Sequence, residues 1–191
     1  MLNLDTHNNL IKIFRYIILI PHRDAVKPLE EYRQKLFSIG VASAHSFPLA
    51  APLAEVSRPF RSQELKELAL YIRSLTKSAD GKILCEKKCA EAKSRHLSFF
   101  GPSFNLAIEE GAFPETAKDK LIRVLNPAVL CASLCKMDSV NDAEPPAISF
   151  RAASVSNLAI RPLPELDYSF EWEIGESVWL PAWKKNPSAL F

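Results

Sequence analysis

The chain has 191 residues, a length that fits one compact domain. Its 48% hydrophobic and 24% charged residues are typical of globular proteins and exclude a disordered, collagen-like or membrane-spanning chain. Lysine and arginine total 24 against 22 acidic residues, so the net charge of +2 cannot hold a polyanion without a local basic cleft. Only five glycines accompany fourteen prolines, and no glycine-rich phosphate-binding pattern occurs.

The first predicted elements are a strand and a helix. Residues 11–20 are apolar on both alternating faces, which is typical of a central strand, and Pro21 ends it. A helix is predicted from Pro28 to a C-terminal cap at Gly40, because apolar residues recur between them at helical spacing. No basic region precedes the apolar run, so we expect a cytoplasmic protein without a secretory signal.

The next elements are an extended segment, a helix and two strands. Residues 45–56 are predicted to be extended, followed by a helix that Ser62 caps and that carries an apolar stripe of Leu65, Leu68, Ile72 and Leu75. Asp80-Gly81 predicts a turn, and 82–93 and 96–106 are predicted to be strands.

In the second half of the chain, Thr116 and Asp119 predict the capped start of a helix that reaches Leu125. Asn126-Pro127 is expected to interrupt this helix and to start a short one through Cys135. Two long strands are predicted over 147–161 and 168–180. The order of elements predicts an α+β fold of two lobes, with two antiparallel sheets facing a central cleft and helices outside.

Two segments carry residues suited to acid–base chemistry on a phosphate. Ala44-His45-Ser46-Phe47-Pro48-Leu49 precedes the Ser62 helix, and Pro145-Pro146-Ala147-Ile148-Ser149-Phe150 opens the late strand. Residues i and i+2 of a strand share a face, so a histidine and a hydroxyl at that spacing point to the same side. Two such strands across a cleft would place one imidazole on each side of a phosphate.

This layout resembles the 2H phosphoesterase superfamily, which includes the LigT-like 2′-5′ RNA ligases and RNA cyclic phosphodiesterases. The resemblance rests on the opening strand 14–21, the two motif segments and the closing strands, and it covers about residues 11–181. It implies a metal-free, cofactor-free protein that acts on or binds 2′,3′-cyclic phosphodiesters of RNA ends or nucleotides.

Both motif segments depart from the family pattern. The first keeps His45 but has Phe47 where the hydroxyl belongs, and the second keeps Ser149 but has Ala147 where the second histidine belongs. We therefore expect impaired catalysis, with His45 as the candidate acid or base and Ser149 as a phosphate ligand. Arg151 falls on the same strand face as Ser149 and could supply a cation, or it could be a solvated arginine at a strand edge.

Other residues allow different interpretations. His96-Leu97-Ser98-Phe99 is an intact motif, but its position leaves the Ala147 segment unexplained, so His96 and Ser98 are the alternative site. The basic stretch 82–96, followed by Phe99 and Phe100, could bind single-stranded nucleic acid or be a solvated strand next to core phenylalanines.

The cysteines form two C-x-x-x-C pairs, Cys85/Cys89 and Cys131/Cys135. They could bind zinc, but their apolar neighbours favour buried thiols, and no metal site is expected. Three tryptophans, Trp172, Trp179 and Trp183, are expected to close the last sheet.

The expected organisation is a mobile terminus at 1–10, one bilobal domain at 11–181 and a tail at 182–191. The expected ligand is RNA or a nucleotide, with neither DNA nor a membrane as a partner. The alternatives are a non-catalytic member of the fold that binds a ligand or a protein, and an unrelated α+β interaction module.

Overall fold

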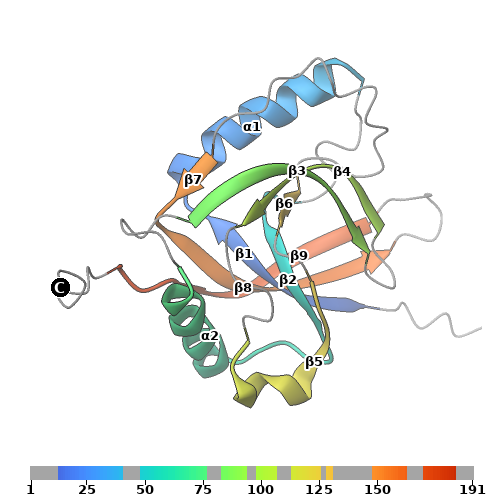
Figure 1. Cartoon of the computed structure of the whole chain (residues 1–191). Helices are drawn as coiled ribbons and strands as arrows, with labels where there is room; N and C mark the ends of the chain where they lie inside the picture. Colours follow the sequence, from blue (N-terminus) through green and yellow to red (C-terminus); the bar gives the residue numbers. More distant parts are fainter. Residues whose placement is uncertain are drawn as a thin grey trace, which may run out of the picture.

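The computed structural model describes residues 13–40, 48–76, 83–93, 98–106, 113–125, 128–130, 148–162 and 170–183. The helices and strands follow one another along the chain as shown in Figure 1: β1 Phe14–Pro21, α1 Arg23–Ser38, β2 Ala51–Val56, α2 Ser62–Ser74, β3 Ile83–Lys93, β4 Ser98–Leu106, the 3-10 helix η2 Glu115–Lys120, β5 Leu121–Val124, β6 Ala128–Leu130, β7 Ile148–Phe150, β8 Ala153–Pro162 and β9 Phe170–Trp179.

The strands form a five-stranded sheet in the order β5-β2-β1-β8-β9 and a four-stranded sheet in the order β6-β4-β3-β7. Every strand pairing in them is antiparallel. The predicted α+β class is confirmed. The two lobes on either side of a cleft stay a prediction.

β1 is the central strand of the larger sheet and is buried on both faces, as its sequence predicts. Ile17 and Leu19 belong to the larger buried cluster, which also contains apolar residues of both helices. Phe14, Tyr16 and Ile18 alternate with them and belong to a second cluster with Leu158 and Ile160 of β8. The continuous apolar run therefore reflects a strand that is covered on both sides.

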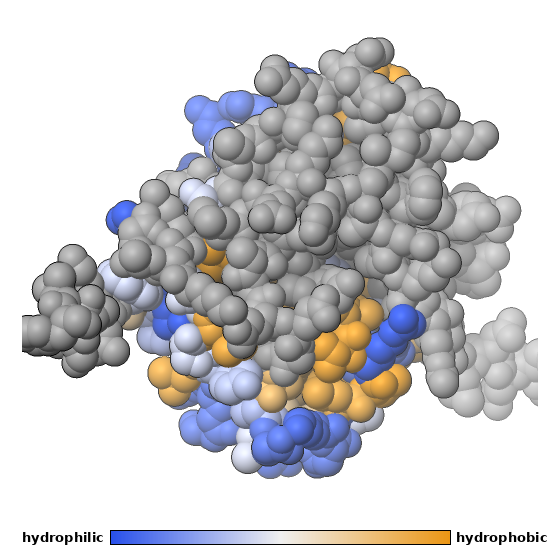
Figure 2. Space-filling view, in the orientation of Figure 1, coloured by the Kyte–Doolittle hydropathy of each residue, from blue (hydrophilic) through white to orange (hydrophobic). Residues whose placement is uncertain are grey.

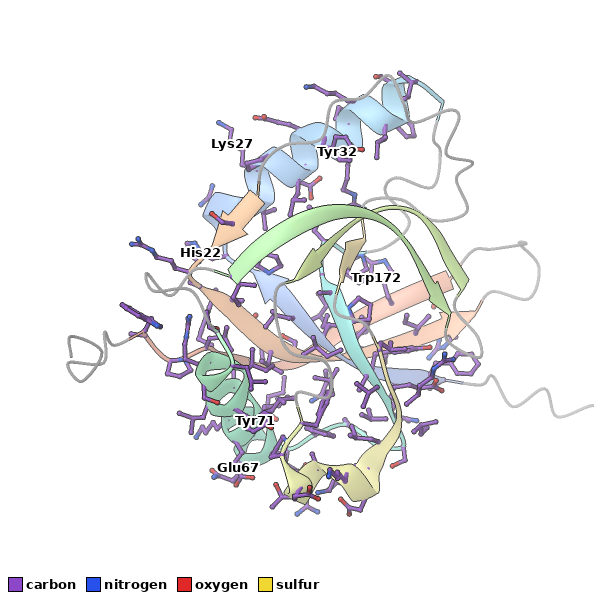
Figure 3. The ribbon with its side chains drawn as sticks, viewed as in Figure 1. His22, Lys27, Tyr32, Glu67, Tyr71 and Trp172 are labelled. Carbon is purple, nitrogen blue, oxygen red and sulfur yellow. The ribbon has the colours of Figure 1, made fainter. Side chains whose placement is uncertain are left out.

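The helix α1 begins at Arg23, so the prediction that Pro28 opens it is wrong. Pro28 lies inside the helix, beyond its first turn, so the helix lacks one backbone N–H donor at this position. At the other end Gly40 has a φ of 94°, a left-handed conformation that favours glycine, as the predicted cap requires. Figure 3 shows Tyr32 pointing from α1 toward the sheets and Lys27 pointing away from them.

The helix α2 buries the apolar stripe that the sequence predicts, with Leu65, Leu68 and Ile72 at its core. It packs on β8 and β9. The cap is not Ser62, because Arg61 is the N-cap residue and Ser62 is the first helical residue. The carboxylate of Glu64 instead accepts the Arg61 backbone N–H at 2.8 Å, which satisfies one exposed donor of the first turn.

The helix predicted from Thr116 to Leu125 is wrong. Only the 3-10 helix η2 forms, and 121–124 become the edge strand β5. β5 pairs with β2, with Arg123 opposite Glu55 and Val124 opposite Ala54. The next segment, 128–130, is the strand β6 and not part of a helix. Both segments form strands because they pair with strands that are distant in the sequence. The local spacing of residues does not reveal such partners.

Two predicted strands also have different limits. Residues 48–50 precede β2 without forming part of a strand, and the strand predicted at 147–161 is two strands, β7 and β8, separated by Arg151 and Ala152. The strands predicted over 82–93 and 96–106 are confirmed as β3 and β4, and the structure adds that the two pair with each other in continuous register. The closing strand is confirmed as β9.

The surface of the described residues carries some large apolar side chains. Ile122 and Val124 of β5 are exposed. Figure 2 shows apolar surface beside hydrophilic surface in the region where Figure 1 places β5 and the start of β1. Among the helices of these residues, none combines the length and the apolar character needed to span a membrane.

Candidate functional site

The predicted site residues are only partly within the described structure. His45, His96 and Ala147 lie outside the described residues. Ser98 is the first residue of β4, where it pairs with Lys93. Ser149 is exposed in the middle of β7, and Arg151 is exposed directly after that strand. The arrangement of His45 with Ser149 therefore stays a prediction.

One geometric expectation is wrong. Strand alternation was expected to place Ala147, Ser149 and Arg151 on one face, but β7 ends at Phe150. β7 pairs with β3, whereas β8 pairs with β1 and β9, so the chain crosses from one sheet to the other at Arg151 and Ala152. Arg151 thus belongs to the segment that connects the two sheets. The alternation of side chains along a single strand therefore does not determine its direction.

Hydrogen bonds from a backbone N–H and from an arginine side chain fix this crossover in place. The His22 backbone N–H donates to the Ala152 carbonyl at 2.8 Å, directly after β1 ends. Arg73, at the end of α2, donates from Nη2 to the Arg151 carbonyl at 2.5 Å and from Nε to the Pro181 carbonyl at 2.8 Å. Partial burial lowers the pKa of the Arg73 guanidinium from its usual value. The crossover is therefore held from β1, from α2 and from the segment after β9.

Two aromatic rings meet at the same place. The rings of His22 and Trp179 have centroids 5.7 Å apart and an interplanar angle of 59°. Trp179 pairs with Ser154 at the start of β8 and is 60% exposed. We call His22, Arg73, Ser149, Arg151 and Trp179 the crossover cluster.

The side chains of the crossover cluster are of the kinds that bind a phosphorylated aromatic ligand. A guanidinium binds phosphate oxygens through charge-assisted hydrogen bonds, and a hydroxyl can donate one more. An exposed indole offers a face on which a base can stack. The cluster contains a single imidazole, so it does not supply the acid and base pair that a two-histidine reaction needs.

Sequence reasoning missed His22 and Trp179 as partners. His22 follows Pro21 at the end of the central strand, and the end of a central strand is a common place for functional residues. Trp179 is at the far end of the chain, so only the pairing of β9 with β8 brings the two rings together.

A second charged cluster lies at the start of α2. Arg58 donates two hydrogen bonds to the Glu64 carboxylate, at 2.9 and 2.7 Å, and Lys120 lies 3.0 Å from the same carboxylate. These hydrogen bonds, that from Arg58 above all, hold the pKa of Glu64 well below its usual range despite some desolvation. Each of these groups has a partner of opposite charge, and the cluster joins α2 to η2.

The inner polar residue Asn157 has a similar structural role. Its side-chain oxygen accepts the Phe60 backbone N–H at 2.8 Å, and its nitrogen donates to the Phe60 carbonyl at 2.8 Å. Both residues are buried. Asn157 therefore ties the segment before α2 to β8.

A buried carboxylate, that of Glu55, lies on the face of the larger sheet that carries the second hydrophobic cluster. Glu55 is 5% exposed, and its Oε2 has no hydrogen-bond partner in the structure as described. Glu55 lies opposite Tyr16 of β1 and opposite Arg123 of β5. A carboxylate repels phosphate, so this part of the sheet is less suited to a phosphate than the crossover cluster is.

Two neighbouring cavities lie along β8 and β9, away from the crossover cluster. One has a volume of about 390 Å³ and is lined by Ile13, Ala159, Ile160, Arg161, Glu171, Trp172 and Glu173. The other, of about 190 Å³, is lined by Arg15, Tyr16, Pro59, Asn157, Leu158, Ala159, Glu173 and Gly175. Ala159 and Glu173 line both cavities.

The cysteine pairs are only partly within the described structure. Cys85 and Cys89 lie in β3, and Cys131 and Cys135 lie outside the described residues. The zinc interpretation is therefore not tested.

Comparisons with known proteins give no match, whether the chain is compared with protein-family models, with curated proteins or with solved structures. The 2H resemblance consequently rests on the order and spacing of the segments in this sequence alone.

Proposed function

We propose that this protein binds the phosphorylated end of an RNA or a nucleotide in a 2H phosphoesterase-like fold whose catalysis is impaired. The observation that carries the proposal is the crossover cluster, in which Arg151 directly follows β7 and lies two residues beyond Ser149. The tilted rings of His22 and Trp179 contact each other beside the same crossover. A 2′,3′-cyclic phosphate is the phosphodiester that the resemblance implies.

The proposed roles follow from the chemistry of each side chain. Arg151 would pair with phosphate oxygens, and the Ser149 hydroxyl would donate to the same group. The exposed indole of Trp179 would stack on the base. Arg73 would act through Arg151, because it binds the Arg151 carbonyl and holds the crossover in place.

Impaired catalysis is expected from the two altered motifs. A positioned acid or base contributes roughly 10²–10⁴ in rate, so the replacement of a histidine by Ala147 should remove most of the turnover. His45 remains the candidate for the other acid–base role. The arrangement of two lobes about a cleft, with His45 on one side and Ser149 on the other, is part of this proposal.

A second candidate function is a protein-interaction module of α+β fold. The acidic strand β9 and the cavities beside it favour this alternative, because Glu173 lines both cavities and Glu171 lines the larger one. Acidic side chains are poor ligands for RNA and good ligands for basic peptides.

The turnover of a 2′,3′-cyclic nucleotide tests the catalytic part of the proposal. We expect no hydrolysis by the wild-type protein beyond that of the His45→Ala variant. Hydrolysis that is substantial and that His45→Ala abolishes would show a competent enzyme and contradict impaired catalysis.

A further inference from the structure

The strand β9 has an unusual exposure for its place in the fold. It is an edge strand of the five-stranded sheet, and among the described strands it pairs with β8 alone. Every residue from Glu171 to Ser177 is exposed, so both faces of the strand are accessible. An edge strand also presents backbone N–H and C=O groups that can pair with another chain.

The two faces of β9 differ in chemistry. Opposite β8, Glu171 pairs with Arg161 and Glu173 with Ala159, and these residues share one face. Trp172 pairs with Ile160 and Ile174 with Leu158 on the other face. Trp172 is 41% exposed and Ile174 is 36% exposed. The strand therefore alternates acidic and apolar side chains, both accessible.

The charge of β9 is of one sign. The sequence Phe170–Trp179 contains three glutamates and no lysine or arginine. Glu171 lies 3.6 Å from Arg161, and Glu176 accepts a hydrogen bond from Ser62. Glu173 makes no hydrogen bond or ion pair with a described residue, and it lines both cavities beside the strand. It is therefore the carboxylate best placed to receive a cation.

We propose that β9 is a docking edge for an extended segment of a partner protein in which basic and apolar side chains alternate. The segment would add a strand to the sheet, with main-chain hydrogen bonds to β9 and a basic side chain at Glu173. Its apolar side chains would cover Trp172 and Ile174. Opposite charges and aromatic pairs across neighbouring strands favour such pairing.

The charge pattern decides between the candidate occupants. A second copy of the chain paired through β9 would bring together two strands that carry glutamates and no lysine or arginine, and like charges on neighbouring strands are unfavourable. A nucleic acid would meet the same glutamates with its phosphates. A basic segment is the occupant whose charge complements the strand.

The features of the edge strand β9 go beyond those that protect an edge against aggregation. Charges and a bulge are common protective devices, and β9 has both, since its register with β8 shifts between Ser156 and Leu158. Protection alone does not explain why a tryptophan stays accessible next to a cavity of about 390 Å³ on the same strand. Such a cavity offers room for one of the side chains that face it from an added strand, where every second side chain points to the same side.

The test is the binding of a labelled peptide of alternating lysine and valine, roughly eight residues long, to the full chain by fluorescence anisotropy. We expect saturable binding to the wild type. The Glu173→Lys variant should weaken it about tenfold. The matched control Glu31→Lys makes the same change of charge on the exposed side of α1 and should leave the affinity unchanged.

A second peptide makes the strand geometry testable without changing the protein. The same sequence with N-methyl groups on alternate residues cannot donate the main-chain hydrogen bonds, so its binding should be lost. Circular dichroism of Glu173→Lys checks that the variant is folded.

Several results would overturn the proposal. They are the absence of peptide binding, equal binding of the N-methylated peptide, or equal weakening by Glu173→Lys and Glu31→Lys. Competition of the peptide by a single-stranded RNA would show a nucleic-acid surface. A dimer in sedimentation that Glu173→Lys abolishes would identify a second copy as the occupant.

Discussion

The buried amide of Asn157 gives the sharpest stability prediction. In the Asn157→Ala variant, Phe60 loses both hydrogen bonds of 2.8 Å that its backbone N–H and C=O make with this side chain. Each bond contributes roughly 0.5–1.5 kcal/mol, so the two together contribute about 1–3 kcal/mol, and the buried backbone groups left unpaired place the loss in the upper part of that range. Phe60 is 2% exposed, so water cannot easily replace the amide. The expected loss in the free energy of unfolding is about 2–3 kcal/mol.

Urea denaturation followed by circular dichroism measures this loss. For a chain of this length the midpoint should fall by about 1 M without a change in slope. The melting temperature should fall by about 5–10 °C. The matched control is Ser156→Ala, next to Asn157 in β8, which removes the 2.6 Å hydrogen bond to Ser177 of β9. Ser177 is exposed and can bond to water, so the control should cost about 1 kcal/mol or less.

One result would contradict this prediction. If Asn157→Ala costs no more than Ser156→Ala, the amide does not hold the segment before α2 to β8, and the account of how the helix is positioned is wrong.

Two further predictions concern the same region of the fold. Because the pKa of Glu64 is lower in the folded state than its ordinary 4.5, its stabilisation is present above that pH and is lost as the pH falls below it. Glu64→Gln should therefore make the unfolding free energy less dependent on pH below about pH 5, as urea titrations at several pH values would measure; an unchanged dependence would contradict the Arg58 pairing. Leu68 is fully buried in α2, and Leu68→Ala should cost about 2–5 kcal/mol in the same assay, whereas the exposed Leu70→Ala should cost little.

The parts of the fold that the sequence predicts well are those where one residue pattern has one structural solution. The unbroken apolar run of β1 requires cover on both faces, and the structure provides two clusters. The stripe on α2 is likewise buried as predicted, because an amphipathic helix has a single way to face a core.

The segment 115–125 shows where local patterns fail. Leu121, Ile122 and Val124 match a helical spacing, yet they form the edge strand that pairs with β2. Ile122 and Val124 are β-branched and fit a strand, but only the presence of β2 decides the outcome. Local spacing cannot reveal a neighbour that is distant in sequence.

The candidate site was predictable only in part for the same reason. Ser149 and Arg151 could be selected because they lie two residues apart in a segment with strand character. Their actual relation depends on the crossover between two sheets, which no local pattern encodes. The pairing of His22 with Trp179 likewise depends on the strand order β1-β8-β9.

The most direct test of the proposed function is a calorimetric titration of 2′,3′-cyclic AMP into the wild type, Arg151→Ala and the control Arg123→Ala. Arg123 is an exposed arginine of β5, outside the crossover cluster. We predict saturable binding to the wild type, about tenfold weaker binding to Arg151→Ala and unchanged binding to Arg123→Ala. No binding to the wild type, or equal affinities for all three proteins, would contradict a phosphate site at the crossover.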